Sequence, residues 1–563
     1  MKKIPLLITL SLLTLCVHAQ NQKIQFNGTA RGEIQSDMLP TSDTINVDQA
    51  LIGNALVDLR MDIRPADNIR IKTDFRFANP MGGFWGQGAT IQLRHISLKG
   101  VANNIVKYRF GNIDLQMSPY TLYNTYAELS EHESEIFKFT RNINEEENFN
   151  NKNTWHQQGV DLSCKLGFNK LIESADLTGF VVRNRSVDEN IIPDRLHAGG
   201  VSKFNINNAS YIAANYINLF ELPRTVNDTV TTKYQNFVYT SDFKFVFRPL
   251  YVFGEAGFSQ VQYEVEGTKP VDIVGEVFEI GVGKKICKNQ LKIDASFRRV
   301  SDDFFSAGAQ SKRINYATTP GIMSVASADK QKRSIGLLDL VRDKNIYNPT
   351  ISSELMDYDF TLNHVTPYGK ATPNRVGGTV LVSYADSAQR YFSTLSGQLL
   401  QDTRGEGTED LRSYTLMQWS GKIAFNNIFD ISKTLALTAG AQYANSYRDG
   451  HAIVSDVDYT STAFDIGGEI EFVSRFDFLF GAKLLMAEGT EYTSKRDEYN
   501  RIVDYNIKKD NCSQQLYAVA LRYRFNDNVN FTVQGSQVTY TNDIVANTDY
   551  KINQLYILFN MRF

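Results

Sequence analysis

Apolar and polar residues alternate along the last twelve positions of the chain, residues 552–563. Five apolar side chains fall on one face of a predicted strand: Leu555, Ile557, Phe559, Met561 and Phe563. Four polar ones fall on the other face, with Leu558 as the exception: Gln554, Tyr556, Asn560 and Arg562. A period of two residues predicts a β-strand with one apolar face. This segment by itself fits the last strand of a secreted sandwich as well as a strand that faces lipid.

The same alternation recurs along the chain and marks about 22 strands, within a range of about 18 to 24. Short turns are predicted at 65–68, 101–104, 207–208, 248–249, 287–289, 386–387, 426–432, 474–475 and 526–528. Long loops fall between them at 36–51, 78–90, 114–154, 183–196, 221–233, 301–375, 401–413, 448–458 and 491–504. A sandwich has no reason to separate short from long connections in this way. The pattern predicts an all-β fold, a single transmembrane antiparallel β-barrel with turns at one rim and loops at the other.

Residues 57–64 and 69–77 show the polar face of the predicted wall most clearly. Their apolar residues would face outward: Val57, Leu59, Met61, Ile63, Ile69, Ile71, Phe75 and Phe77. Side chains directly opposite one another lie on the same face of a sheet. A register with Asp62 opposite Lys72, Arg60 opposite Asp74 and Asp58 opposite Arg76 sets unlike charges against each other. We predict that register, which also brings Arg64 opposite Arg70.

Two further strands, 91–94 and 106–110, extend the charged face, and the alternation breaks at His95 and Ile96, as at a β-bulge. The predicted pore-lining residues are Asp58, Arg60, Asp62, Arg64, Arg70, Lys72, Asp74, Arg76, Arg94, Lys107 and Arg109. Basic residues outnumber acidic ones in this set. It is either a ladder of ion pairs inside the wall or a basic track that attracts anions. Asp465, Glu469 and Glu471 would face inward from 464–472, so a transverse field across the lumen is a further hypothesis.

The terminal strand resembles that of bacterial outer-membrane β-barrels, in which the final aromatic belongs to the insertion signal. The resemblance covers the chain after its first segment and rests on pattern, with no motif of one subfamily. It implies that Phe559, Met561 and Phe563 form the membrane-insertion signal. It also implies contact with outer-membrane lipid and lipopolysaccharide, and with the barrel-insertion machinery. The chain resembles, less specifically, uncharacterised barrels of Bacteroidota. No segment before the first strand resembles the plug of TonB-dependent transporters, so no plug domain is expected.

Residues 1–19 have the features of a secretory signal peptide. Lys2 and Lys3 precede an apolar run, and small residues stand at the first and third positions before Gln20. Cleavage is predicted after Ala19, which leaves 20–563 as the barrel in the outer membrane of a Gram-negative bacterium. No later apolar run approaches the ~20 residues that a membrane helix needs. A helical membrane protein is therefore not expected.

Composition argues against several other classes of function. The formal net charge is −3, which gives no reason to expect a nucleic-acid partner. Cys164, Cys287 and Cys512 are scattered and fit neither a disulfide framework nor a zinc site. We expect no metal and no cofactor. The histidines form no H-E-x-x-H motif, so catalysis is not expected, although His156 could meet a serine of another strand.

The two longest loops differ in composition. Residues 114–154 are rich in glutamate, which favours a solvated acidic loop over a cation site because no calcium-loop spacing is present. Residues 301–375 contain Phe304, Phe305 and an aliphatic run at 335–340. We expect this loop to fold into the lumen and narrow it. The alternative is an external cap packed on other loops.

These features support three hypotheses about function. The first is a porin-like channel that passes polar, anionic solutes or glycans. The second is a non-conducting barrel scaffold of a secretion or surface-assembly complex, with its lumen blocked by residues 301–375. The third and weakest is an outer-membrane barrel enzyme that acts on lipid or peptide.

Overall fold

The computed structural model gives the chain one large sheet. It describes residues 23–38, 50–80, 88–122, 132–148, 155–168, 171–185, 194–222, 232–265, 267, 269–309, 336–341, 360–405, 410–451, 454–496, 502–544 and 549–563. The predicted signal peptide lies outside these residues. No helix in this described part is both long and apolar enough to cross a membrane.

The sheet has 22 strands, and each strand pairs antiparallel with its neighbours in sequence. The strands are β1 (Ile24–Met38), β2 (Ala50–Ala66), β3 (Ile69–Pro80), β4 (Thr90–Ala102), β5 (Val106–Leu115), β6 (Trp155–Gly167), β7 (Ser174–Arg185), β8 (Arg195–Asn205), β9 (Tyr211–Glu221), β10 (Thr232–Phe247), β11 (Leu250–Val265), β12 (Val271–Ile286), β13 (Leu291–Val300), β14 (Arg375–Ala385), β15 (Tyr391–Gln401), β16 (Ser413–Ala424), β17 (Leu435–Arg448), β18 (Val457–Val473), β19 (Phe476–Arg496), β20 (Ile502–Asn526), β21 (Val529–Asn542) and β22 (Tyr550–Arg562). The helices are α2 (Glu135–Asn148), α3 (Phe360–Asn363) and α4 (Phe425–Phe429), with short 3₁₀ turns η1 (Leu338–Leu340) and η4 (Gly369–Ala371). The predicted fold class and strand number are confirmed.

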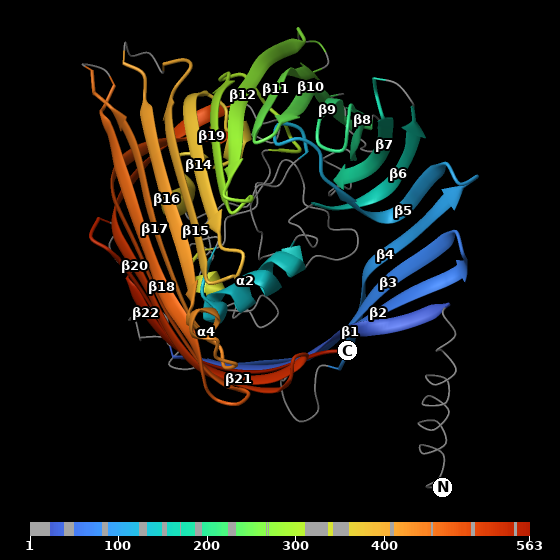
Figure 1. Cartoon of the computed structure of the whole chain (residues 1–563). Coiled ribbons are helices and arrows are strands. Elements are labelled where there is room, and N and C mark those ends of the chain that lie inside the picture. The colour runs from blue at the N-terminus through green and yellow to red at the C-terminus, as the bar shows by residue number, and fades with distance from the viewer. Residues whose placement is uncertain are drawn as a thin grey trace.

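The first and last strands close the sheet into a barrel (Figure 1). β1 and β22 pair from Thr29 opposite Arg562 to Met38 opposite Asn553. The last residue completes the seam, because the Gly28 N–H donates to the Phe563 carbonyl oxygen at 2.9 Å and the Phe563 N–H donates to the Gly28 carbonyl at 3.1 Å. A Cβ on Gly28 would lie 2.8 Å from a ring carbon of Phe563 and 2.1 Å from the Asp58 carbonyl oxygen of β2, so this position beside the seam requires glycine. Closure matters because the backbone N–H and C=O groups of an open sheet edge would have no hydrogen-bond partners in lipid.

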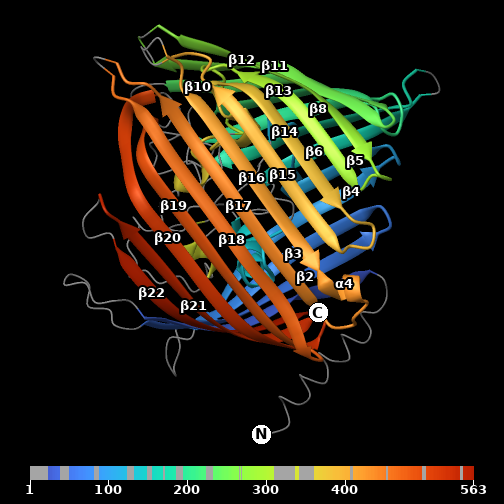
Figure 2. The same cartoon turned by 60° about the vertical axis from the view of Figure 1, so that its left-hand side comes forward.

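Short connections gather at one rim of the barrel, the turn end, and long ones at the other, the loop end (Figure 2). The turn between β10 and β11 is two residues, Arg248 and Pro249, whereas β13 and β14 are separated by residues 301–374. The carboxyl terminus lies at the turn end (Figures 1 and 2). In outer-membrane barrels short turns face the periplasm, so the turn end is the periplasmic one.

One face of the wall is apolar and exposed, as the alternation predicts. In β22, Leu555, Phe559 and Phe563 are exposed, while Tyr556 and Leu558 are buried on the other face. Leu558, the one apolar residue on the polar face of this strand, therefore points inward as its position in the alternation predicts. Large apolar side chains also cover the outside of other strands: Val57, Phe77, Phe258, Ile280, Val380, Leu399, Met417, Ile466, Val519 and Leu521.

Aromatic rings form a belt around part of the turn end. Phe476 lies 4.5 Å from Tyr523 between ring centroids, Tyr523 lies 4.8 Å from Phe525, and Phe525 lies 6.5 Å from Phe559. Such girdles mark the level of the lipid headgroups in outer-membrane barrels. The predicted insertion residue Phe559 belongs to this belt.

The predicted register between β2 and β3 is confirmed. Asp58 lies opposite Arg76, Arg60 opposite Asp74, and Asp62 opposite Lys72. The expected pairing of Arg64 with Arg70 is wrong, because the ladder shifts between Ile63 and Ala66. The predicted break in β4 is confirmed, since the β3–β4 ladder shifts where Asp74 faces His95 and Phe75 faces Leu93.

The lumen as candidate functional site

Helix α2 lies inside the ring of strands and identifies the lumen face (Figure 1). It contacts β19, where Phe137 lies over Gly481 and Glu133, just before the helix, pairs with Lys483. Ladder partners share a face, so the assignment passes from strand to strand around the barrel. The odd-numbered residues of β19 lead in this way to Asp58, Arg60, Asp62, Lys72, Asp74 and Arg76 on the inner face of β2 and β3.

Two glycines form the flat patch of the inner wall on which helix α2 and the residues just before it pack. Gly467 of β18 lies directly opposite Gly481 of β19. A Cβ on Gly481 would lie 2.4 Å from a ring carbon of Phe137, and one on Gly467 would lie 2.5 Å from Cβ of Ser134. Because any side chain at these two positions would meet the docked segment, the flat patch fixes where the helix sits.

A buried ion cluster holds the start of the same segment. Arg141 Nε donates to Glu133 Oε2 at 2.7 Å, and Lys483 Nζ lies 2.8 Å from Glu133 Oε1. Burial by itself would raise the pKa of the Glu133 carboxyl, but Arg141 and Lys483 overcome that effect and hold the pKa at about 2. The prediction of a solvated acidic loop is therefore wrong for Glu133, because its charge is neutralised by partners that are distant in sequence.

The β13–β14 connection also enters the lumen. Its first residues are bonded to the inner wall, where the Phe305 N–H donates to Ser259 Oγ at 2.9 Å and the Ala307 N–H donates to Asn236 Oδ1 at 3.1 Å. Phe304 packs over Gly275 of β12, where a Cβ would lie 2.1 Å from its backbone nitrogen. The described parts of this loop therefore fold inward, as expected, and do not form an external cap.

The later residues of this loop pack on the opposite side of the lumen. Leu337, Leu338, Leu340 and Val341 share a buried apolar cluster with Ile136 and Phe137 of the α2 segment and with inner residues of β18–β22. His364 is buried against Tyr459, with ring centroids 4.9 Å apart. Burial lowers the pKa of His364 to about 3, so this imidazole is neutral near pH 7. The two inward loops therefore pack against the inner wall on opposite sides of the lumen.

The two loops meet the wall together at Glu279 of β12, near mid-height of the barrel. The Tyr120 hydroxyl donates to Glu279 Oε2 at 2.9 Å, and Lys370 Nζ donates to Oε1 at 2.7 Å. Arg298 lies directly opposite Glu279 in the β12–β13 ladder. Burial and the neighbouring Glu279 raise the pKa of Tyr120 far above its ordinary value, so the hydroxyl stays protonated and donates. We call this group the Glu279 latch.

The predicted pore-lining residues form several ion pairs on the inner face of β2–β6. Arg76 Nη2 lies 2.7 Å and Arg94 Nη1 3.5 Å from Asp58 Oδ2. The other pairs are Arg60 Nε with Asp74 Oδ2 at 3.2 Å, Arg70 Nε with Asp62 Oδ1 at 2.6 Å, Arg64 Nε with Asp62 Oδ1 at 3.9 Å and Arg109 Nε with Asp161 Oδ1 at 2.6 Å. The ion-pair ladder therefore accounts for these arginines.

The lysines of this wall have a different environment. Lys107 is exposed and has Val101 and Ser163 as its ladder partners. Lys99, which sequence reasoning missed, lies between Arg70 and Arg109 in the two adjoining ladders. The bulge in β4 restores Lys99 to the inner face, a shift that the alternation could have revealed once the break was placed. The ladder partners of Lys107 bring no negative charge to it.

More lysines line the inner face near the turn end: Lys203, Lys244, Lys285 and Lys292 of β8, β10, β12 and β13. Sequence reasoning missed these positions in the later strands. Half the ring away, β18–β20 carry Glu469, Glu471 and Asp477 against Arg522 and Arg524. The inward orientation expected for Glu469 and Asp465 follows from the β18–β19 ladder. Within the described residues, no His, Cys, Asp and Glu side chains group as a metal site.

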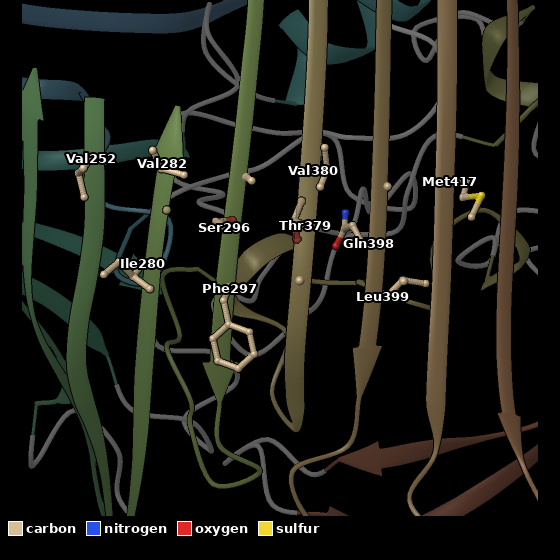
Figure 3. Close-up of a pocket in the computed structure, with 14 residues that line it drawn as sticks. Val252, Ile280, Val282, Ser296, Phe297, Thr379, Val380, Gln398, Leu399 and Met417 are labelled. Atoms are coloured by element: carbon tan, nitrogen blue, oxygen red, sulfur yellow. The ribbon is translucent and has the colours of Figure 1, made fainter. Parts of the chain in front are cut away.

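A separate groove of about 710 Å³ lies on the outer face of the wall (Figure 3). Ala295, Gly378 and Gly397 leave it shallow between larger side chains of the neighbouring strands. The larger ones share the outward face: Val252, Ile280, Val282, Phe297, Val380, Leu399 and Met417. The groove is apolar and faces away from the lumen, so it does not belong to a path through the barrel.

A closed antiparallel barrel with an apolar outside, an aromatic belt, short turns at one rim and a charged lumen defines the class of outer-membrane porin-like β-barrels. No protein-family model and no curated protein matches the chain. Among solved structures, the outer membrane channel DcaP of Acinetobacter baumannii is 9% identical, with 96% of this chain and 97% of that chain covered and a TM-score of 0.28. OccK8 (OprE) of Pseudomonas aeruginosa is 8% identical over 96% and 98%, with a TM-score of 0.34.

The P pilus usher (PapC) translocation pore is also similar, at 8% identity over 95% of this chain and 99% of that chain, with a TM-score of 0.37. Identities and TM-scores at this level transfer no residue role from any of these proteins. The chemistry of this barrel follows from its own lumen.

Proposed function

We propose that the chain is an outer-membrane channel for polar, anionic solutes, with a lumen narrowed by the loops that carry Tyr120 and Lys370. The observation that carries the proposal is the set of inner-face lysines near the turn end. Lys107 has Val101 and Ser163 as its ladder partners, and Lys285 and Lys292 lie directly opposite each other. Like-signed charge on the walls of a narrow lumen raises the local concentration of anions.

The arginines of the same wall contribute less to selectivity. Arg76 and Asp58 are both buried, and their side chains are only 5% and 6% exposed. Two paired charges cancel at distances longer than their separation, so this couple adds little net field. Replacing Arg60, Arg76, Arg94 or Arg109 would also remove an ion-pair partner from Asp58, Asp74 or Asp161. The lysines therefore give a cleaner test.

The test is the reversal potential of the refolded protein in a planar bilayer under a potassium chloride gradient. We expect anion preference for the wild type and a shift toward cations for the double variant Lys99→Gln/Lys107→Gln. Lys509→Gln/Lys551→Gln removes the same charge from the outer face and serves as the matched control. Equal reversal potentials for all three proteins, or cation preference in the wild type, would contradict the proposal.

A second candidate function is a non-conducting scaffold for secretion or surface assembly. The observation that favours it is the packing of the two loops against the inner wall on opposite sides of the lumen. Deleting residues 301–374 should then make a silent barrel conduct and abolish recovery of its partner in a pull-down. A wild-type barrel that conducts steadily would argue against this candidate. Insertion through the barrel machinery, with Phe559, Met561 and Phe563 as its signal, belongs to both proposals.

A further inference from the structure

Four lysines form an arc along the inner wall near the turn end: Lys203, Lys244, Lys285 and Lys292. Lys285 and Lys292 are direct ladder partners on β12 and β13. The charges of Lys203, Lys285 and Lys292 all act on Lys244 of β10. Like charges placed directly opposite one another destabilise a sheet. Their presence here in the lumen, where water and ions can reach them, calls for a counter-charge.

The wall itself supplies only part of that counter-charge. Asp294 pairs with Lys292 and accepts a hydrogen bond from the Tyr251 hydroxyl. The next carboxylate toward mid-height, Asp242, already accepts from Asn215 Nδ2 at 2.7 Å. Asp176 lies opposite Lys203, but it also lies opposite Lys165 and accepts from Asn205 Nδ2 at 2.7 Å. The lysines therefore outnumber the carboxylates along this part of the inner wall.

Aromatic rings hold two of the lysines against the wall. Lys203 Nζ lies 3.9 Å from the ring centroid of Tyr211, and Lys244 Nζ lies 4.8 Å from that of Tyr251. The Tyr251 ring occupies the space beside Gly283, where a Cβ would lie 2.1 Å from the Tyr251 Cζ atom. Cation–π contacts of this kind restrict a long side chain without neutralising its charge. The arc is thus ordered as well as charged.

The extent of the arc indicates the size of its ligand. β8 and β13 are separated by five inter-strand steps, which at ~4.8 Å each make about 24 Å along the wall. A small anion such as chloride or phosphate reaches one or two ammonium groups at a time. A chain with anionic groups at short intervals reaches all four at once, and each added contact multiplies its affinity.

We propose that this lysine arc binds an extended polyanion, a flexible chain that carries several phosphate or carboxylate groups. The inference deepens the proposed anion channel and rests on it for the route by which the ligand passes. Binding itself needs no conduction, so the two can fail separately.

The experiment is isothermal titration of the folded, full-length barrel in detergent. The probes are inorganic polyphosphate of about ten units, oligogalacturonate of similar length, and orthophosphate. We expect the polyphosphate or the oligogalacturonate to bind at least tenfold more tightly than orthophosphate, and the tighter of the two identifies the anionic group. Lys244→Gln/Lys285→Gln should weaken that binding at least tenfold, whereas Lys509→Gln/Lys551→Gln should leave it within twofold.

Two results would overturn the proposal. One is equal affinity for orthophosphate and both chains, and the other is unchanged chain binding in Lys244→Gln/Lys285→Gln. Lys244→Arg/Lys285→Arg keeps the charge and should restore binding, which separates loss of the arc from loss of the fold. A barrel that binds the chain through these lysines but passes no current would refute the channel and leave the arc standing.

Discussion

Replacing Gly481 with alanine should release helix α2 from the wall. The new Cβ would lie 2.4 Å from one ring carbon of Phe137 and 2.9 Å from Cγ2 of Ile136. Phe137 is fully buried, so its ring cannot swing aside, and the segment has to move. Overpacking of a core by one methyl group costs about 1–3 kcal/mol. That range raises the ratio of undocked to docked helix about 5- to 150-fold.

Limited trypsin digestion with mass spectrometry measures this ratio. Arg141 is 8% exposed and bonded to Glu133 when the helix is docked, so cleavage after Arg141 requires undocking. Cleavage that follows the undocked population should accelerate by the same factor. Gly535→Ala is the control, because a Cβ there meets nothing within 4 Å. Equal cleavage rates for wild type and Gly481→Ala would refute the docking geometry.

Three further predictions concern the stability of the barrel. Glu133→Gln should cost about 3–5 kcal/mol by leaving buried cations uncompensated, measured as a lower melting temperature. The pKa of Glu133 is about 2 in the folded protein and 4.5 ordinarily. The stability difference between wild type and Glu133→Gln should therefore be complete above pH 4.5 and shrink as the pH falls toward 2. Gly28→Val should block closure of the barrel at the Phe563 seam. A folded, heat-modifiable band of this variant on a gel would contradict the prediction. Arg76→Gln should lower the free energy of unfolding in urea by about 1–3 kcal/mol, since Arg94 still reaches Asp58, and an unchanged urea midpoint would count against the buried pair.

Much of the wall is predictable from sequence because the period of two is a local property. Each residue of a strand has its face set by its neighbours, so the outward side of β22 and the charged side of β2 and β3 follow from their spacing. Charge matching then selected the β2–β3 register. It failed at Arg64 and Arg70, where a shift in the ladder near the turn broke the alternation.

The sequence predicted far less about which residues meet inside the lumen. That residues 301–375 enter the lumen was predicted from their apolar content, but their contacts with Asn236 and Ser259 join segments far apart in the chain. The burial of Glu133 had no local signal, because its partner Lys483 comes 350 residues later. Glutamates in a loop are ordinarily solvated, and only the closed barrel brings a cation to this one.

The sequence by itself therefore determined the strands, their faces, their approximate number and the rim to which each connection belongs. Only the tertiary structure decided which side chains meet inside. The lysine arc lies on β8, β10, β12 and β13, whose inner faces are aligned by the pairing register of β8–β13, and the Glu279 latch joins two loops to one strand. Alternation is encoded between adjacent residues, whereas the lumen is formed by closure, which brings together residues with no relation in sequence.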